Sequence, residues 1–262
     1  GNSDELGRRM AACCDVFIMD AFGSAHRAHA STNAIARHVE MVLPGFLMES
    51  ELKALNGVLR KPKAPVIAVL GGAKVSSKLL LLERFSELSD KIFVGGGIAN
   101  TFIAASGHSI GRSLYEETML DAAGKLLSQT DIPIPKDVMV AKAFDSRATA
   151  ILRLIDEVRE DEMILDIGPV TAREWSSTIE ESGTIIWNGP MGVFEFDQFG
   201  EGTREIAEGI ARSPAYSLAG GGDTIAAIDK YNVSDNVSYI STGGGAFMEY
   251  LEGKKLPGVD IL

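Results

Sequence analysis

The chain has 262 residues, 45% of them apolar, and its 36 acidic and 25 basic side chains give a formal net charge of −11. This length and apolar share allow one large domain or two smaller ones. The acidic balance argues against general binding to nucleic acids or anionic membranes, because the surface field has the wrong sign for phosphate groups.

The two cysteines are adjacent, at positions 13 and 14, which excludes a disulfide scaffold and is typical of a reducing compartment. No apolar run approaches the roughly 20 residues that are needed to cross a bilayer. We therefore expect a cytoplasmic protein without membrane or nucleic-acid partners.

The chain begins with a predicted helix over residues 4–12 and a predicted strand over 16–19, and the loop DAFGSAHRAHAS follows at 20–31. In that loop Arg27 offers a planar guanidinium group, which suits a phosphate or a carboxylate. Histidines flank Arg27, but a metal site is disfavoured because no further ligands lie nearby. Anion recognition and a plain surface loop both stay open.

A helix with breakers on both sides is predicted next. Apolar residues recur with helical spacing between Gly45 and Leu59, with Pro44 before them and Pro62 after them. A bounded helix of this kind between two α/β regions indicates an interdomain connection.

Beyond Pro65, strand-like and helical segments alternate with short links. Strands are predicted at 66–70, 91–95, 138–142, 162–166, 184–188, 216–219 and 237–241, and helices at about 75–88, 97–106, 117–128, 171–181, 201–212, 223–231 and 245–252. Several of these strands are continuously apolar, as expected of strands covered on both faces. The pattern predicts an α/β fold, a doubly wound parallel sheet of the Rossmann-like kind, with ligands beyond the carboxyl ends of its strands.

Four glycine clusters follow predicted strands: Gly71-Gly72, Gly95-Gly96-Gly97, Gly220-Gly221-Gly222 and Gly243-Gly244-Gly245. Free amide groups at such helix starts bind anions. A tight turn that only lets a helix pack on a strand is the competing interpretation of any one cluster, but the repetition favours a phosphate ligand. No P-loop motif occurs, and the dinucleotide fingerprint is incomplete, which disfavours a P-loop kinase and a nicotinamide oxidoreductase.

Lys74 and Lys78 lie four residues apart at a predicted helix start, so we expect them on one helical face. Cations oppose the helix dipole there unless an anion neutralises them. A polyphosphate would do so, and two solvated lysines are the alternative.

Two carboxylates stand in loops that follow predicted strands. Glu195 ends the segment WNGPMGVFE and is free to accept hydrogen bonds from ribose hydroxyls, although a plain turn explains the segment equally well. Asp223 follows a glycine cluster, where it can cap the next helix or hold Mg²⁺.

The chain resembles the phosphoglycerate kinases. The segments that carry the resemblance, in family order, are DAFGSAHRAHAS, GFLMESEL, GGAKVSSK, GGGIANTF, DIGP, WNGPMGVFE, GGGDT and STGGGAFMEYLEGKKLPGV. The resemblance implies reversible phosphoryl transfer from 1,3-bisphosphoglycerate to MgADP, which gives 3-phosphoglycerate and MgATP. It also implies a monomeric glycolytic enzyme.

Roles for individual residues come from the resemblance alone. It implies that Lys78 and the helix start Gly243–Gly245 act in catalysis, that Arg27 grips the triose acid, and that Asp223 faces Mg²⁺. The residues that it places at the ADP or ATP are Gly72, Lys74, Lys78, Gly95, Gly96, Gly97, Asn188, Pro190, Val193, Glu195, Gly220, Gly221, Gly222, Asp223 and Thr224.

The resemblance also predicts the domain organisation. The expected parts are a remnant of a triose-binding domain (1–45), an interdomain helix (46–61), a nucleotide-binding domain (62–250) and a tail that returns toward the first domain (251–262). Early family segments have no counterpart here, so we expect that part to be missing, which leaves strand 16–19 without partners and residues 1–45 unstructured. A fragment that binds ADP or ATP without turnover is the alternative to a kinase.

Overall fold

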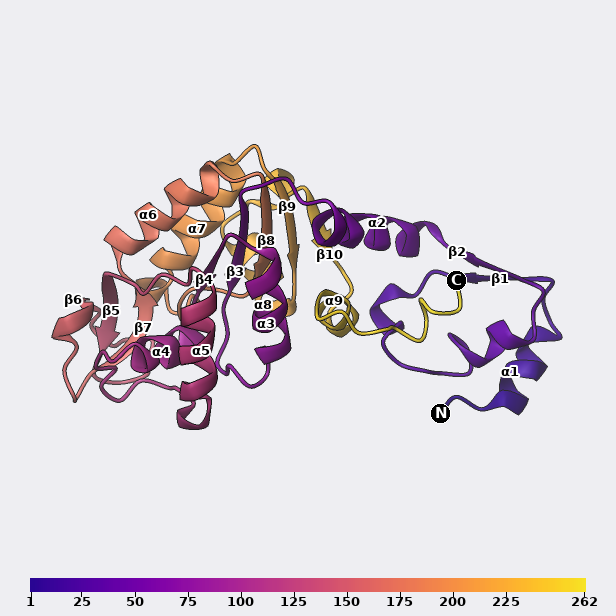
Figure 1. The fold of residues 1–262 in the computed structure, drawn as a ribbon, viewed down its shortest axis with the longest axis horizontal. Helices are drawn as coiled ribbons and strands as arrows, with labels where there is room; N and C mark the ends of the chain where they lie inside the picture. The colour runs from indigo at the N-terminus through magenta and orange to yellow at the C-terminus, as the bar shows by residue number, and fades with distance from the viewer. The chain divides into compact units, whose positions relative to one another are not determined.

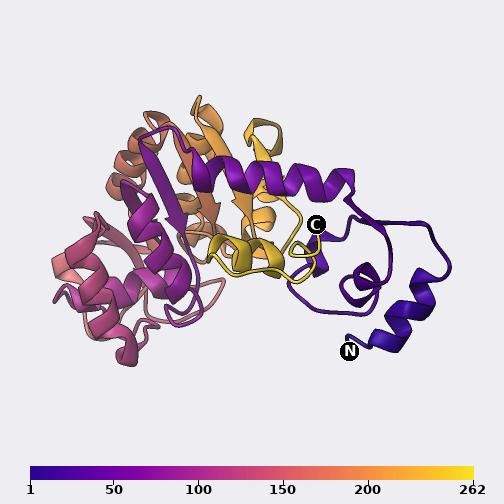
Figure 2. The same ribbon diagram turned by 45° about the vertical axis from the view of Figure 1, so that its right-hand side comes forward.

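The computed structural model describes all 262 residues, which form two compact units (Figure 1, Figure 2). The first unit comprises Gly1–Lys61 and Ser241–Leu262, and the second comprises Pro62–Ile240. Residues 241–250 therefore belong with the first unit and not with 62–240, where the sequence analysis placed them. The buried carboxylate of Glu51 is one contact that ties this segment to the first unit, since it accepts hydrogen bonds from Ser241 Oγ (2.8 Å) and from Thr242 N (2.9 Å).

The second unit is built on a five-stranded sheet. Its strand order is β10 (Tyr239–Ser241), β9 (Tyr216–Gly220), β8 (Thr184–Asn188), β3 (Val66–Leu70) and β4 (Lys91–Val94). The four strands from β9 to β4 pair in parallel. β3 and β8 are buried along their whole lengths, as the apolar run of β3 and the apolar centre of β8, Ile185–Trp187, predict.

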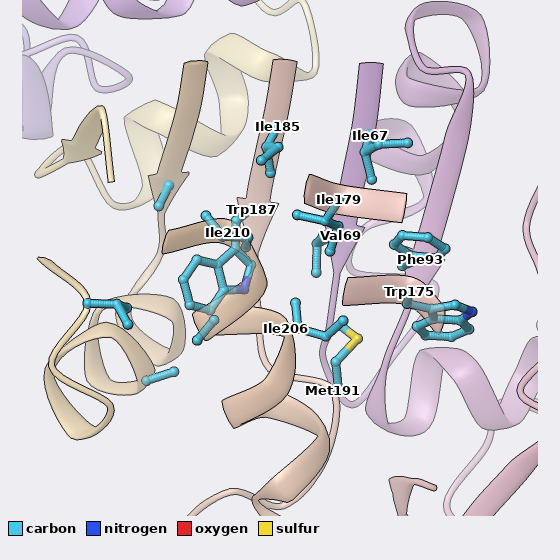
Figure 3. Packing of buried hydrophobic residues seen from close by; sticks show 14 of the residues in the cluster. Ile67, Val69, Phe93, Trp175, Ile179, Ile185, Trp187, Met191, Ile206 and Ile210 are labelled. Atoms are coloured by element: carbon cyan, nitrogen blue, oxygen red, sulfur yellow. The ribbon is translucent and has the colours of Figure 1, made fainter. Parts of the chain in front are cut away.

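Helices cover this sheet, and a large hydrophobic core includes side chains of α6 (Pro169–Glu180), α7 (Glu201–Arg212) and α8 (Gly222–Lys230). α6 and α7 lie side by side (Figure 1). Phe93 of β4 stacks on Trp175 of α6 with ring centroids 4.6 Å apart, and Trp187 of β8 lies farther along the same core (Figure 3). α3 (Leu79–Leu88) packs on β4, and α4 (Gly96–Ala105) packs on α5 (Leu120–Gln129). The predicted doubly wound α/β fold is confirmed.

The predicted strands 138–142 and 162–166 are not part of the parallel sheet. They correspond to β5 (Asp137–Ala141) and β7 (Met163–Ile167), which form a separate antiparallel sheet with β6 (Ile151–Leu154), a strand that the sequence analysis missed. A parallel pair needs a crossover connection, usually through a helix. No α-helix lies between β5 and β7, so these strands reverse direction instead.

The first unit combines short elements from both ends of the chain. α1 (Asp4–Ala11) is capped by Ser3, whose Oγ accepts a hydrogen bond from Leu6 N. β1 (Val16–Met19) leads to the loop at 20–31, and α2 (Phe46–Arg60) follows later. α9 (Gly245–Leu251) and the end of the chain complete the unit, since Gly258 N donates to Ala25 O (2.8 Å).

The expectation that strand 16–19 lacks a partner is wrong. β1 pairs in parallel with β2 (Met41–Pro44), with Val16 opposite Met41. β2 gives a weak signal in the sequence, because the strand is short and ends at a proline. Residues 1–45 are thus not unstructured, because they also hold α1 and two short 3₁₀ turns at Phe22–Ser24 and Ala34–Arg37.

Replacing Ile185 with Ala tests the sheet core. Ile185 is fully buried, and its truncation is expected to lower the free energy of unfolding by about 2–5 kcal/mol. Both tryptophans of the chain belong to this core, so urea unfolding followed by their fluorescence measures the loss. The control is Val170→Ala, at a side chain on α6 that is 42% exposed, which should change the value by less than about 0.5 kcal/mol. Equal losses in both variants would contradict the assigned core.

Candidate functional site

A pocket of about 470 Å³ opens at the carboxyl ends of the parallel strands. It collects residues from the turns after β3, β4, β8 and β9, together with two apolar side chains from other loops. Its lining consists of Gly72, Ala73, Gly96, Gly97, Leu114, Phe144, Pro190, Gly192, Val193, Glu195, Phe196 and Asp223. Separate segments that the sequence analysis singled out are thus brought together on one wall.

The glycines at this edge allow one backbone to pack directly on another. A Cβ atom at Gly71 would lie 1.7 Å from Pro190 O, and one at Gly97 would lie 2.2 Å from Ala73 O. Gly95 is buried against the Cα atom of Met191, and Gly96 adopts a left-handed φ of +65°. Close packing of turns therefore explains these glycines, and the amide-lined wall of the pocket is its product.

Lys78 lies in the loop before α3, not on the helix, because α3 begins at Leu79. Its ammonium donates hydrogen bonds to Gly71 O (2.6 Å), to Asn188 O (3.1 Å) and to the side-chain oxygen of Asn188. Burial lowers the pKa of Lys78 to about 8, while the carboxylate of Asp223 opposes this shift. The protein thus holds a partly desolvated cation beside the pocket.

Lys74 differs from Lys78 in its surroundings. Its side chain is exposed and forms no ion pair. The prediction that the two lysines share a helical face is wrong, because residues 71–78 turn as a loop with the Val75 side chain buried inside it. The ammonium of Lys74 is available to an anion from solvent.

Asn188 and Thr224 are buried, and they tie the ends of β8 and β9 together. Asn188 Nδ2 donates to Gly220 O (2.6 Å), and Thr224 Oγ1 donates to the same oxygen (2.9 Å). Thr224 Oγ1 also accepts from Gly189 N (2.7 Å). Gly221 has a φ of +100°, and α8 starts at Gly222. These side chains shape the turn at 220–224 through contacts within the protein.

Two exposed carboxylates face the pocket, Asp223 and Glu195. Asp223 does not cap α8, since no side-chain hydrogen bond closes that helix start, so the capping interpretation is wrong. The loop that carries Glu195 is held by Lys230, whose ammonium donates to Phe194 O (2.6 Å) and to Asp197 Oδ1 (2.7 Å). Neither carboxylate is used in a hydrogen bond or an ion pair, so both are available to a ligand.

Apolar side chains that no sequence motif predicted form the remaining wall. Leu114 is 59% exposed and Phe144 is 62% exposed, which is unusual for side chains of this size. Phe144 meets Phe196 at a centroid distance of 5.1 Å. A planar, largely apolar ligand fits between such side chains. Their sequence signal was weak, because each is a single apolar residue in a loop.

The other predicted site residues lie in the first unit. Arg27 is exposed, and its Nε donates to His26 Nε2 (3.2 Å). His26 lies against Gly245, where a Cβ would be 3.3 Å from Nε2. Gly243 packs on Phe22, and Gly244 has a φ of +51° just before α9.

No group of three or more His, Cys, Asp or Glu side chains is arranged to hold a metal ion. None of the helices has the length and the apolar character that a bilayer crossing requires.

Comparison with known proteins points to one family. The model of the phosphoglycerate kinase family matches residues 1–254. The chain is similar to the solved phosphoglycerate kinase from Coxiella burnetii, with 48% identity and a TM-score of 0.96 over 99% of this chain and 68% of that one. It is also similar to the solved phosphoglycerate kinase from Pyrococcus horikoshii OT3, with 33% identity and a TM-score of 0.83 over the same shares of the two chains.

Gly97→Ala tests whether the turns need direct backbone contact. Helix propensity alone favours alanine in α4, but the new Cβ would clash with Ala73 O, so we expect a loss of about 1–3 kcal/mol in the free energy of unfolding. Gly124 in α5 has nothing within 4 Å of its Cβ position, so Gly124→Ala should stabilise by about 0.5–1 kcal/mol. Denaturant unfolding measures both changes, and a gain at both positions would contradict the packing argument.

Proposed function

Because the chain belongs to the phosphoglycerate kinase family, we propose that the pocket of its second unit binds the ADP or ATP of that kinase. The protein is a phosphotransferase. It moves a phosphoryl group reversibly between 1,3-bisphosphoglycerate and MgADP, giving 3-phosphoglycerate and MgATP in glycolysis. The observation that carries the proposed site is the placement of apolar side chains, glycine turns and two carboxylates around one pocket at the strand ends, with the ammonium of Lys78 close to Gly72 of its lining.

The nucleoside binds along the apolar wall. Its base lies between the glycine turns on one side and Val193, Leu114 and Phe144 on the other, and these residues line the pocket together. Glu195 accepts hydrogen bonds from the ribose hydroxyls, for which its free carboxylate is suited. Pro190 and the backbone at 95–97 complete this part of the wall.

The phosphates bind toward the start of α8. Amide groups of Gly221, Gly222 and Thr224 offer donors at the positive end of the helix. Lys74 and Lys78 add positive charge from the loop after β3. Asn188 acts through its contact with Lys78 and through the Gly220 carbonyl, since its own side chain is buried.

Asp223 fits a magnesium ion that arrives with the nucleotide. Mg²⁺ is usually bound by one or two carboxylates together with phosphate oxygens and waters, so a cluster of three protein ligands is not required. The Asp223 carboxylate is exposed to the pocket and unpaired. When bound, the ion neutralises charge on the phosphate oxygens.

Phosphoryl transfer itself depends on placement and charge neutralisation, with little covalent chemistry for the protein. Lys78 carries the positive charge that stabilises the moving phosphoryl group. In the first unit, Arg27 binds the triose acid and the helix start Gly243–Gly245 faces the transferred group. The family resemblance supports these two assignments, as it supports a monomer in the cytoplasm.

Titration calorimetry of the 262-residue chain with MgADP tests the nucleotide site. We expect saturable binding, weakened at least tenfold by Asp223→Asn because the metal loses an anionic ligand, while adenosine affinity is unchanged. Asp229→Asn, at an exposed aspartate of the same helix, should leave MgADP affinity as it is.

A coupled assay then asks whether the chain turns over. Turnover that falls with Lys78→Ala supports the kinase, and MgADP binding without turnover supports the nucleotide-binding alternative. Failure of the unaltered chain to bind MgADP would remove the proposed site.

The pKa of Lys78 predicts a pH dependence of binding. Without ligand this pKa is about 8, well below the usual 10.5, and phosphate charges nearby raise it again. Binding therefore takes up a proton above pH 8, and MgADP affinity falls as the pH rises toward 10.5. Calorimetry in buffers of different ionisation enthalpy measures this uptake. In Lys78→Arg the uptake should vanish, because guanidinium stays charged, and persistence of the uptake in that variant would assign it to another group.

A further inference from the structure

The loop from Ala73 to Ser77 carries Lys74 and leads into Lys78, yet little inside the loop holds it in place. Ser77 Oγ donates to Lys74 O (2.8 Å), and Lys78 N donates to Val75 O (2.9 Å). The buried Val75 side chain anchors its middle. The remaining side chains at 73–77 are exposed, so this loop needs a further anchor to keep a defined shape.

Glu116 provides that anchor from a distant segment. Its two carboxylate oxygens accept hydrogen bonds from Ser76 N (2.8 Å) and from Ser76 Oγ (2.5 Å). No other side chain from outside the loop donates to residues 73–77 or accepts from them. Charge-assisted bonds of this kind are about twice as strong as neutral ones.

The backbone of Glu116 is fixed in turn. Its amide donates to Thr101 Oγ1 (3.1 Å), and that hydroxyl donates to Gly97 O (2.9 Å) at the start of α4. Leu114, two residues earlier, lines the pocket, and its carbonyl accepts from Asn100 Nδ2 (3.0 Å). The carboxylate therefore extends from a segment that the pocket wall itself positions.

The surroundings of Glu116 favour the ionised form of its carboxyl group. The two hydrogen bonds from Ser76 lower the pKa of its carboxyl group, and Lys74 adds to the effect. The positive charge of Lys74 stabilises this carboxylate through space, but the two side chains form no ion pair. Its ammonium remains free for an external anion.

We propose that Glu116 is a positioning residue, which holds the 73–77 loop through Ser76 so that Lys74 and Lys78 are directed at the nucleotide phosphates. Glu116 itself touches no ligand. Because Glu116 keeps the loop ordered before the nucleotide binds, the entropy cost of ordering the loop does not weaken binding. The inference rests on the proposed nucleotide site.

Glu116→Ala separates this role from a general structural one. We expect MgADP affinity to fall about tenfold, because a preorganised pair of charge-assisted bonds is lost. Adenosine affinity should be unchanged, because the apolar wall of the pocket and Glu195 are intact. Glu117→Ala removes the same charge one residue later, at an exposed side chain, and should match the unaltered chain.

Two further variants keep the test informative if Glu116→Ala unfolds. Ser76→Ala removes only the hydroxyl bond and should weaken MgADP about threefold, since the amide bond remains. Glu116→Gln should recover affinity to within about threefold, because its carbonyl accepts from Ser76 N and its amide group donates to the hydroxyl, although both bonds lack the charge.

Equal losses for MgADP and adenosine in Glu116→Ala or Ser76→Ala, or unchanged MgADP affinity in both variants, would overturn the inference. A complete lack of MgADP binding by the unaltered chain would instead refute the proposed nucleotide site.

Discussion

The candidate site depends on direct backbone contact between turns at one edge of the parallel sheet. The turn after β3 packs on the turn after β8, and the turn after β4 packs on both, with no room for a Cβ atom at Gly71, Gly95 or Gly97. Close approach leaves amide groups and small apolar surfaces facing the pocket. The shape of the site therefore follows from steric limits on the backbone before any polar side chain contributes.

The charged groups near the pocket differ in how firmly the protein holds them. The ammonium of Lys78 is enclosed by carbonyl oxygens, and burial makes its charge easier to lose. Lys74, Asp223 and Glu195 remain exposed and unpaired, while Glu116 and Lys230 fix the loops that carry Lys74 and Glu195. Exposed, unpaired charges beside one pocket are available to form charge-assisted contacts with a charged ligand.

The first unit is organised by a different interaction. The carboxylate of Glu51, buried within α2, accepts hydrogen bonds from Ser241 and Thr242. This fastens the segment before α9 to a helix that comes some 190 residues earlier in the chain. An unpaired carboxylate at that depth would be strongly unfavourable, so the three bonds that it accepts hold the segment in place.

Local patterns in the sequence were enough to predict several strands and helices, the glycine turns and the family. Continuous apolar runs located β3 and β8, periodicity located α7 to the residue, and the glycine clusters marked the strand ends. The motifs also identified the family. These features depend on neighbours within a few residues, so one chain segment is enough to reveal them.

Other features were decided only by tertiary structure. β5 and β7 lie outside the parallel sheet, because no helix connects them. The ammonium of Lys78, in the loop before α3, is held by the carbonyl of Gly71 after β3 and that of Asn188 in β8. Phe144 and Glu116 have partners that are distant in sequence. Each of these outcomes depends on contacts between segments far apart in the chain. Spacing within one segment carries no information about such contacts, because only the folded backbone brings the partners together.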